Sequence, residues 1–307
     1  MSGSETMEID QLRHFVKVVD LGNFTRAAEE VLLSQSALSR SIARLETELG
    51  QPLFDRQTRK ITLTDAGRVL LDRAKEVLAI VDDVKTQIRD DGESGRIRLG
   101  AIPTIAPYLL PRLLTAFGKE FPHSQVMVQE DTTAVLLSKL SEGEIDLAIL
   151  ARPIEAKYVE VEDLFSEELL LVLSSENPLS RKRQLCLADL ASEPFVLLAE
   201  AHCLTDNILT HCRQKAVHPV SIERTSQLIS VQELVSLNHG VSFIPAMARV
   251  VDSSERRVYR SLSQPKPSRQ IVMVWNPYRF QSRLMESFRA LLRKHRSLDS
   301  KHSKSRK

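Results

Sequence analysis

The amino-acid sequence predicts an all-α winged helix-turn-helix domain and a long linker helix, followed by an α/β domain. In the first 90 residues, apolar side chains recur at helical spacing, and capping residues stand between the helical segments. From Arg96 onward, short strand-like runs alternate with helical stretches. This alternation is typical of an α/β domain whose strands are joined by crossover helices.

The composition is that of an ordinary globular protein. With 307 residues, 42% of them hydrophobic and 27% charged, the chain is long enough for two domains with their own cores. It lacks an apolar run long enough to span a bilayer, and its N-terminus lacks a signal-peptide pattern. We therefore expect a cytoplasmic protein without a membrane partner, whose three cysteines are thiols at rest.

Three short helices are predicted before residue 50. An amphipathic helix over residues 8–20 packs behind a second helix, which Asn23 caps and which ends near Leu33. Ser34 caps a third helix that Gly50 stops. The free face of this third helix offers amide, hydroxyl and guanidinium groups that suit a DNA major groove, namely Gln35, Ser36, Ser39, Arg40 and Arg44.

The segment after Gly50 alternates like a β-hairpin over residues 54–64. It places Arg56, Arg59 and Lys60 beside the third helix, as a wing on the phosphate backbone would. The alternative is a small helical bundle whose solvated faces are merely polar.

Thr64 is expected to cap a long helix over residues 65–89. Its apolar residues recur at alternating steps of four and three, namely Leu70, Ala74, Val77, Val81, Val84 and Ile88. Such a heptad seam predicts pairing between two subunits, which would place two recognition helices on an inverted repeat of double-stranded DNA. The alternative is a lone helix packed on its own domain. Residues 90–95 form a polar hinge.

The order of residues from Asn23 to Gly67, with SQSALSRSIARLETELG at its centre, resembles the DNA-binding domain of LysR-type transcriptional regulators. The likeness runs through the whole chain. It implies a DNA-binding regulator rather than an enzyme, commonly a tetramer built as a dimer of dimers, with RNA polymerase as a further candidate partner.

The same resemblance implies a regulatory domain of two lobes, similar to a periplasmic binding protein, that the chain crosses twice. We expect strands at residues 97–102, 125–130, 146–150, 169–173, 195–198, 241–244 and 271–275. The expected boundaries are 1–64 for the DNA-binding domain, 65–89 for the linker helix, 96–300 for the regulatory domain (lobe I 96–165 and 268–300, lobe II 166–267) and 301–307 for a disordered basic tail.

The stretch AHCLTDNILTHC, residues 201–212, follows a predicted strand. A cysteine between a histidine and a helix start is in surroundings that favour thiolate, which peroxide oxidises to a sulfenic acid that condenses with a second thiol. In a helix, Cys203 and Cys212 would stand about 13 Å apart. A disulfide tolerates about 7 Å between Cα atoms, so closing one must unwind or shift the helix.

HCLxD with a second cysteine nine positions after the first resembles the sensing segment of the peroxide-responsive activators of this family. The resemblance implies that Cys203 is peroxidatic, that Cys212 is resolving, and that the chain controls oxidative-stress genes. It also implies a hydrogen peroxide pocket, formed by Thr104, Thr133, His202, Asp206 and Arg269.

Two other functions stay open at this point. One is a LysR-type regulator that binds a small metabolite between its lobes, with idle cysteines. The other is a thiol peroxidase with an appended helix-turn-helix, which the absence of enzyme and nucleotide fingerprints disfavours. No cofactor and no metal site are expected. Cys186, between apolar neighbours, is expected to be a core residue.

Overall fold

The computed structural model describes residues 7–55, 61–199, 204–205, 208–209, 212 and 222–302. The chain divides into two compact units, residues 1–89 with the segment 141–144, and residues 90–140 with 145–307. The predicted fold class is confirmed, because a helix-turn-helix unit precedes a two-lobed α/β unit. In the part of the chain that is described, we find no helix of the length and apolarity that crossing a membrane requires.

The first unit is helical apart from a short hairpin. Its elements are α1 (Ile9–Leu21), α2 (Phe24–Glu30), α3 (Gln35–Leu49), β1 (Phe54–Asp55), β2 (Thr62–Leu63) and α4 (Asp65–Arg89). β1 and β2 pair antiparallel, with Phe54 opposite Leu63. This pairing is the base of the predicted wing, whose residues 56–60 lie outside the described residues.

The predicted helix caps are confirmed. The Asn23 side chain accepts the backbone N–H groups of Thr25 and Arg26, at 2.9 and 3.1 Å. Ser34 Oγ accepts the N–H of Ala37, and Thr64 Oγ1 accepts the N–H of Gly67. These bonds satisfy N–H groups that have no partner within their helix.

The core of this unit is built around aromatic and aliphatic side chains from α1, α2, α3 and β1. The Phe54 ring lies 5.4 Å from the Phe15 ring and 5.6 Å from the Phe24 ring, between ring centroids. Leu70 and Ala74 of α4 also belong to this core. The predicted six-residue seam on α4 is therefore divided, because its first two members pack within their own unit.

The second unit begins after the linker helix. Its first lobe contains β3 (Gly95–Ala101), α5 (Ala106–Glu120), β4 (Ser124–Glu130), α6 (Thr133–Glu142), β5 (Leu147–Ala151), the first part of β6 (Glu160–Ser174), β11 (Ser268–Trp275) and α10 (Arg283–His302). Its second lobe contains the rest of β6, β7 (Phe195–Leu198), β8 (Ile222–Thr225), α8 (Leu228–Ser236), β9 (Ser242–Pro245), α9 (Ala246–Val251), β10 (Arg257–Arg260) and two 3-10 helices, Pro178–Arg181 and Leu187–Leu190.

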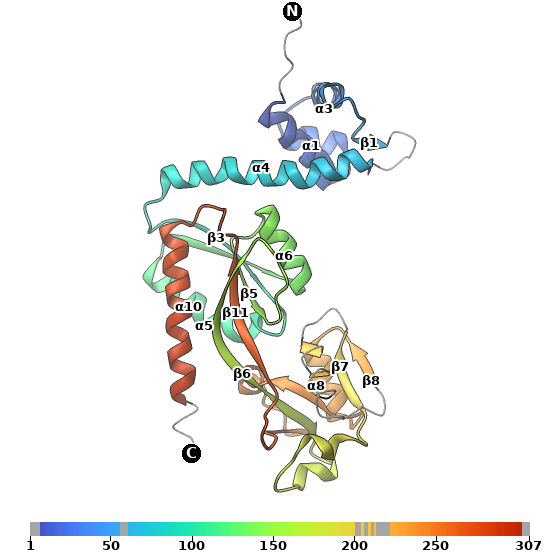
Figure 1. Cartoon of the computed structure of the whole chain (residues 1–307), viewed down its shortest axis with the longest axis vertical. Coiled ribbons are helices and arrows are strands. Elements are labelled where there is room, and N and C mark those ends of the chain that lie inside the picture. The colour runs from blue at the N-terminus through green and yellow to red at the C-terminus, as the bar shows by residue number, and fades with distance from the viewer. Residues whose placement is uncertain are drawn as a thin grey trace, which may run out of the picture. The chain divides into compact units, whose positions relative to one another are not determined.

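One long strand, β6, takes part in both lobes (Figure 1). Its residues 160–168 pair with β11, and its residues 169–174 pair with β9 and β10. The ladder with β11 contains an irregularity, because Ile271 faces Phe165 whereas Val272 faces Asp163. Leu164 thus has no partner in the ladder and forms a bulge.

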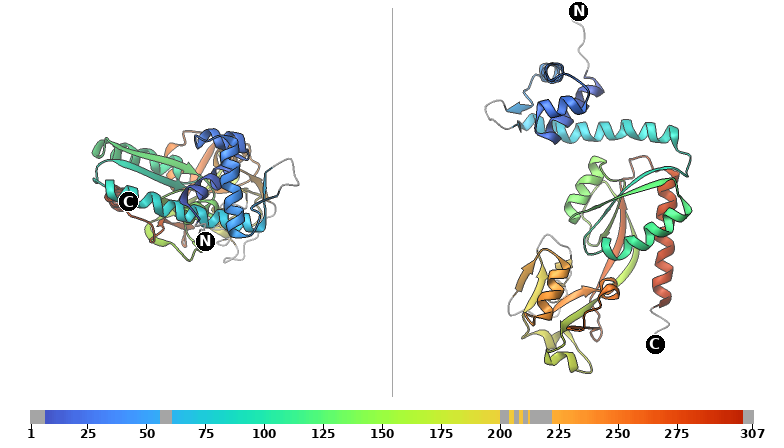
Figure 2. Two further views of the ribbon diagram at one scale, coloured as in Figure 1. Left: turned by 90° about the horizontal axis from the view of Figure 1, so that it is seen from above. Right: turned by 180° about the vertical axis from the view of Figure 1, so that it is seen from behind.

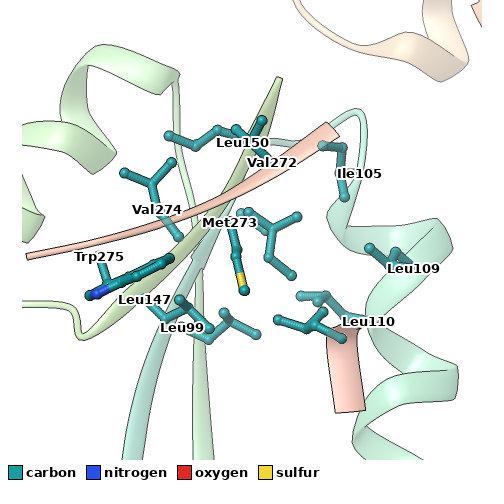
Figure 3. Packing of buried hydrophobic residues seen from close by; sticks show 14 of the residues in the cluster. Leu99, Ile105, Leu109, Leu110, Leu147, Leu150, Val272, Met273, Val274 and Trp275 are labelled. Atoms are coloured by element: carbon teal, nitrogen blue, oxygen red, sulfur yellow. The ribbon is translucent and has the colours of Figure 1, made fainter. Parts of the chain in front are cut away.

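The strands of the first lobe follow the order β6-β11-β5-β3-β4, in which β3 runs parallel to both β4 and β5. Figure 3 shows the packing of its core, where Met273 and Val272 of β11 lie among leucines of β3, β5 and α5. α10 packs on α5, with the Phe288 and Phe117 rings 5.0 Å apart. In the second lobe, α8 lies beside the parallel pair β7 and β8 (Figure 2).

Candidate functional site

The outer face of α3 is the candidate DNA-binding surface. Leu38, Ile42 and Leu45 point into the core, which turns the opposite face to solvent. Of the predicted contact residues on this helix, Gln35, Ser36, Arg40 and Arg44 are exposed and Ser39 is half-buried. Gln35 Nε2 donates to Ser39 Oγ at 3.0 Å, which orients the Gln35 amide. The predicted wing cations Arg56, Arg59 and Lys60 lie outside the described residues.

A histidine on α1 supports this helix from behind. His14 Nδ1 lies 2.8 Å from Oγ of Ser41, a buried residue of α3. Burial lowers the pKa of His14, Asp10 opposes this effect, and Arg44 adds to it. Neutral imidazole is therefore favoured at this contact. His14 was not predicted, since one polar residue on an amphipathic helix carries no distinctive signal.

Two threonines mark the ends of neighbouring parallel strands in the first lobe. Ala101, the last residue of β3, is the register partner of Glu130, the last residue of β4. Thr104 and Thr133 each follow their strand end by three residues. The carboxyl ends of parallel strands form the usual ligand-binding edge of an α/β sheet. The structure thus places both predicted pocket threonines at such an edge.

Arg269 is buried behind Thr104. Its Nη1 donates to Thr104 Oγ1 at 2.7 Å and its Nη2 donates to the Thr104 carbonyl oxygen at 3.0 Å. Its Nε donates at 2.9 Å to Glu167 Oε2, across the ladder of β11 and β6. With a side chain that is 0% exposed, Arg269 holds Thr104 in place from the protein interior.

Glu167 was not predicted, and it connects the lobes. Its second oxygen, Oε1, accepts the backbone N–H of Met247 at 2.8 Å, in the first turn of α9. A buried carboxylate needs a cation and hydrogen-bond donors to offset its desolvation, and Arg269 and Met247 supply both. The sequence contains no local signal for this pairing.

Thr133 carries a buried hydroxyl group without a partner. Its Oγ1 has no hydrogen bond within the part of the chain that the structure describes, and the atom is shielded from solvent. Buried hydroxyls are almost always paired, and exceptions in a folded protein often belong to a site that receives a ligand or a water. Thr133 also begins α6, where backbone N–H groups lack helical partners.

Cys212 lies in the core of the second lobe. It is 1% exposed and belongs to the same apolar cluster as Leu204 and Ile208. Burial raises the pKa of its thiol to about 11. Next to Leu204, the Thr205 hydroxyl is buried and donates to the Leu198 carbonyl at 2.9 Å. The predicted residues His202, Cys203 and Asp206 lie outside the described residues.

The prediction that Cys186 is a core residue is wrong. Cys186 is exposed and stands at the N-terminus of the 3-10 helix Leu187–Leu190. Its neighbours Leu185 and Leu187 are buried, so alternating side chains face inward and the cysteine faces outward.

An open groove lies where β5 ends, beside the paired strands β6 and β11. It is lined by Arg152, Pro153, Ile154, Ser166, Ser268, Arg269 and Gln270. Neither Thr104 nor Thr133 lines it. Arg269, which lines the groove, is also the residue that hydrogen-bonds Thr104.

The chain matches two family profiles, which together cover most of its length. The bacterial regulatory helix-turn-helix protein of the lysR family matches residues 9–68, and the LysR substrate binding domain matches residues 90–297. Among curated proteins, the DNA-binding transcriptional dual regulator OxyR of Escherichia coli K12 is 34% identical over 277 residues, which is 88% of this chain and 90% of the relative.

Solved structures show a likeness to the same family. A full-length OxyR of Pseudomonas aeruginosa with a cysteine-to-aspartate substitution has a TM-score of 0.76 at 27% identity, covering 96% of each chain. A cysteine-to-serine mutant of Corynebacterium glutamicum OxyR with bound H2O2 has a TM-score of 0.64 at 29% identity, covering 95% of this chain and 93% of that one. The chain therefore belongs to the LysR family of DNA-binding transcriptional regulators, which are not enzymes.

Proposed function

We propose that this regulator senses hydrogen peroxide by oxidation of Cys203, which then forms a reversible disulfide with Cys212. The observation that carries the proposal is the position of Cys212 as a neutral thiol in an apolar core. Such a thiol does not react with peroxide first, because the thiolate is the nucleophile. The likeness to OxyR proteins over most of the chain, one of them solved with bound H2O2, supports the same assignment.

The chemistry assigns one role to each cysteine. The Cys203 thiolate attacks one peroxide oxygen, the O–O bond breaks, and the departing hydroxide takes up a proton to become water. The resulting sulfenic acid condenses with the Cys212 thiol, releasing a second water and forming the disulfide. Overall, one peroxide molecule oxidises two thiols and yields two water molecules. Cellular thiols reduce the disulfide and reset the sensor.

The peroxide pocket is proposed to include the hydroxyl groups of Thr104 and Thr133, with His202 and Asp206. Thr104 has its oxygen occupied as an acceptor by Arg269, so its own O–H remains available to donate. The Thr133 hydroxyl is buried without a partner among the described residues. Donors of this kind orient peroxide and assist the departure of hydroxide, which is a poor leaving group. In this proposal Arg269 positions Thr104 and is not itself a contact to peroxide.

Disulfide formation would change the second lobe. Cys212 shares its cluster with Leu204 and Ile208, so drawing its sulfur toward Cys203 removes apolar side chains from that core. These side chains must then repack, and a subunit interface is the place we propose for it. In this way oxidation would alter the geometry of a dimer, or of a dimer of dimers.

The DNA-binding surface is proposed to be the outer face of α3, with Gln35, Ser36 and Arg40 reaching the major groove. The linker helix α4 would pair with a second copy through Val77, Val84 and Ile88 of the predicted seam, which are exposed, and Val81, which is half-buried. Ile80, which was not part of the predicted seam, is exposed on the same face. This pairing would place two α3 helices on an inverted-repeat operator, from which the regulator would control oxidative-stress genes, with RNA polymerase as its partner in activation.

Thiol trapping with mass spectrometry tests the sensor. Purified reduced protein is pulsed with low-micromolar peroxide, and free thiols are blocked with iodoacetamide before digestion. We expect a disulfide that joins Cys203 to Cys212, absent in Cys203→Ser and retained in the matched control Cys186→Ser. If all thiols stay free while the protein still binds DNA, peroxide sensing fails and metabolite sensing becomes the function to test.

A further inference from the structure

A leucine in the turn between α2 and α3 has an unusual backbone. Leu32 has φ +57°. This value lies in the left-handed region, which residues other than glycine and asparagine rarely adopt. Among the described residues, Asn238 is the one other non-glycine position with positive φ. Asparagine tolerates this conformation, whereas leucine is strained in it.

The neighbouring helices show what the turn itself requires. Gly22 ends α1 with φ +58° and Gly50 ends α3 with φ +64°. Leu32 occupies the same place after α2, because its N–H donates to the Glu29 carbonyl and the N–H of Leu33 donates to the Ala28 carbonyl, at 3.2 and 2.9 Å. This bonding is the Schellman motif, in which glycine is the preferred left-handed residue. Leucine at this place therefore opposes the local backbone preference.

The Leu32 side chain does not serve the core. It is 92% exposed, the highest value among the large apolar side chains that the structure describes. Val31, immediately before it, packs against the core of this unit. Because the leucine side chain is exposed, it adds no core packing that would offset the backbone strain. Strain of this kind is typical of functional positions.

The exposed leucine continues the candidate DNA-binding surface. Residues 32–36 are all exposed, so Leu32 joins directly to Ser34, Gln35 and Ser36 at the start of α3. The N-terminal end of a recognition helix is the part that reaches base edges in the major groove. The apolar group that the major groove offers is the 5-methyl group of thymine.

We propose that Leu32 is a specificity-determining residue that contacts the 5-methyl group of a thymine beside the bases read by α3. This inference rests on the proposed α3 surface. It adds an apolar contact to the polar contacts of Gln35 and Ser36. The operator would then carry a thymine at the position facing the turn, in each half-site.

The test uses full-length reduced protein and a duplex that this protein selects from a random-sequence library. Each thymine of the duplex is replaced in turn by deoxyuridine, which lacks only the methyl group. We expect one thymine per half-site whose replacement weakens binding about threefold in the wild type. In Leu32→Asn and Leu32→Ala, binding to the unmodified duplex is weakened by a similar factor, and deoxyuridine at that position has no further effect.

Two further variants separate the possible failures. Gln35→Ala tests the α3 surface itself, and Ile9→Ala removes another exposed apolar side chain of the same unit, with regular helical backbone. If Gln35→Ala loses affinity while both Leu32 variants keep wild-type affinity and deoxyuridine sensitivity, the Leu32 contact is overturned and the α3 surface stands. If Gln35→Ala also binds normally, the proposed α3 surface fails, and the Leu32 inference fails with it.

Thermal unfolding distinguishes a binding role from a folding role. Because asparagine accommodates the left-handed backbone, Leu32→Asn is expected to raise the unfolding temperature by about 3 °C. A lower unfolding temperature in this variant would show that the leucine serves the fold, which would overturn the proposal.

Discussion

Arg269 and Thr104 are 165 positions apart in the chain, yet the guanidinium group of one donates to both the hydroxyl and the carbonyl oxygen of the other. The same guanidinium group pairs with Glu167, which in turn accepts the N–H of Met247. One buried cation thus connects a loop of the first lobe, the strand β6 and the start of α9. Loss of this cation is therefore expected to lower the stability of the fold as well as to impair peroxide sensing.

We expect Arg269→Met to lower the free energy of unfolding by about 3 to 5 kcal/mol, because it leaves the Glu167 carboxylate buried without its cation. Urea unfolding followed by circular dichroism measures the change. The matched control is Arg152→Met, which breaks the exposed pair of Arg152 and Asp163 and should cost less than about 1 kcal/mol. Equal effects of the two substitutions would contradict a special role for the buried pair.

Thr133→Val should slow peroxide sensing without lowering the stability of the fold. Valine has nearly the same shape and removes a buried hydroxyl that lacks a partner among the described residues, so the free energy of unfolding should not fall. Oxidation of Cys203 by peroxide should nevertheless slow at least about tenfold, measured by quenched-flow thiol trapping, because a donor to peroxide is lost. Thr115→Val, on the exposed side of α5, should alter neither quantity. An unchanged oxidation rate in Thr133→Val would remove Thr133 from the pocket.

The buried thiol of Cys212 predicts a pH dependence of stability. Its pKa is raised from the ordinary value of 9.0 to about 11 in the folded protein. The unfolded chain therefore releases this proton at lower pH than the folded chain does, so the stabilisation is complete below pH 9 and declines as the pH rises toward 11. The wild type should lose more unfolding free energy between these pH values than Cys212→Ala does. Identical pH profiles would contradict burial of the thiol.

Reactivity offers a second test of the two described cysteines. Iodoacetamide should modify the exposed Cys186 quickly at pH 8, and Cys212 only when the lobe opens locally. Peptide mass spectrometry over a time course measures both rates. Comparable rates would contradict the burial of Cys212.

Substitution on the linker helix should dissociate the oligomer. Val84 is 52% exposed on the same face of α4 as Ile80 and Ile88. Val84→Lys places a charge in the proposed subunit contact, so sedimentation velocity should show a smaller species, and operator affinity should fall. Thr86→Lys, which adds the same charge about half a turn away, is the control. If both variants keep the wild-type mass, α4 does not hold the subunits together.

Local signals accounted for most of the helical unit. Asn23, Ser34 and Gly50 fix helix ends through bonds to residues within five positions, so the sequence alone places these boundaries. The linker seam was only partly predictable. Heptad spacing cannot tell whether Leu70 and Ala74 face a second copy or their own core, and the structure shows the latter.

Long-range pairing explains what sequence reasoning missed. β10 has the sequence RVYR, which is charged and does not predict a strand. It forms a strand because it pairs with β6, with Arg257 opposite Ser174. The first part of β6 was missed for the same reason, since its residues 160–168 are mostly acidic. Glu167 meets Arg269 across 102 positions of chain. Motif resemblance pointed to Thr104 and Arg269, but the hydrogen bond from the buried guanidinium group to the Thr104 hydroxyl could be found only from coordinates.

Chain length is a constraint on β6 outside the bulge at Leu164. Because side chains alternate between the two faces of a strand, losing one residue turns every following side chain to the opposite face. Deleting Leu164 itself would leave a regular ladder, because Asp163 and Phe165 already face the adjacent residues Val272 and Ile271. Deleting a paired residue such as Leu170 would instead turn the apolar set of one part of β6 outward. Substitutions along β6 can be absorbed one at a time, whereas loss of one paired residue would disrupt the packing of a lobe.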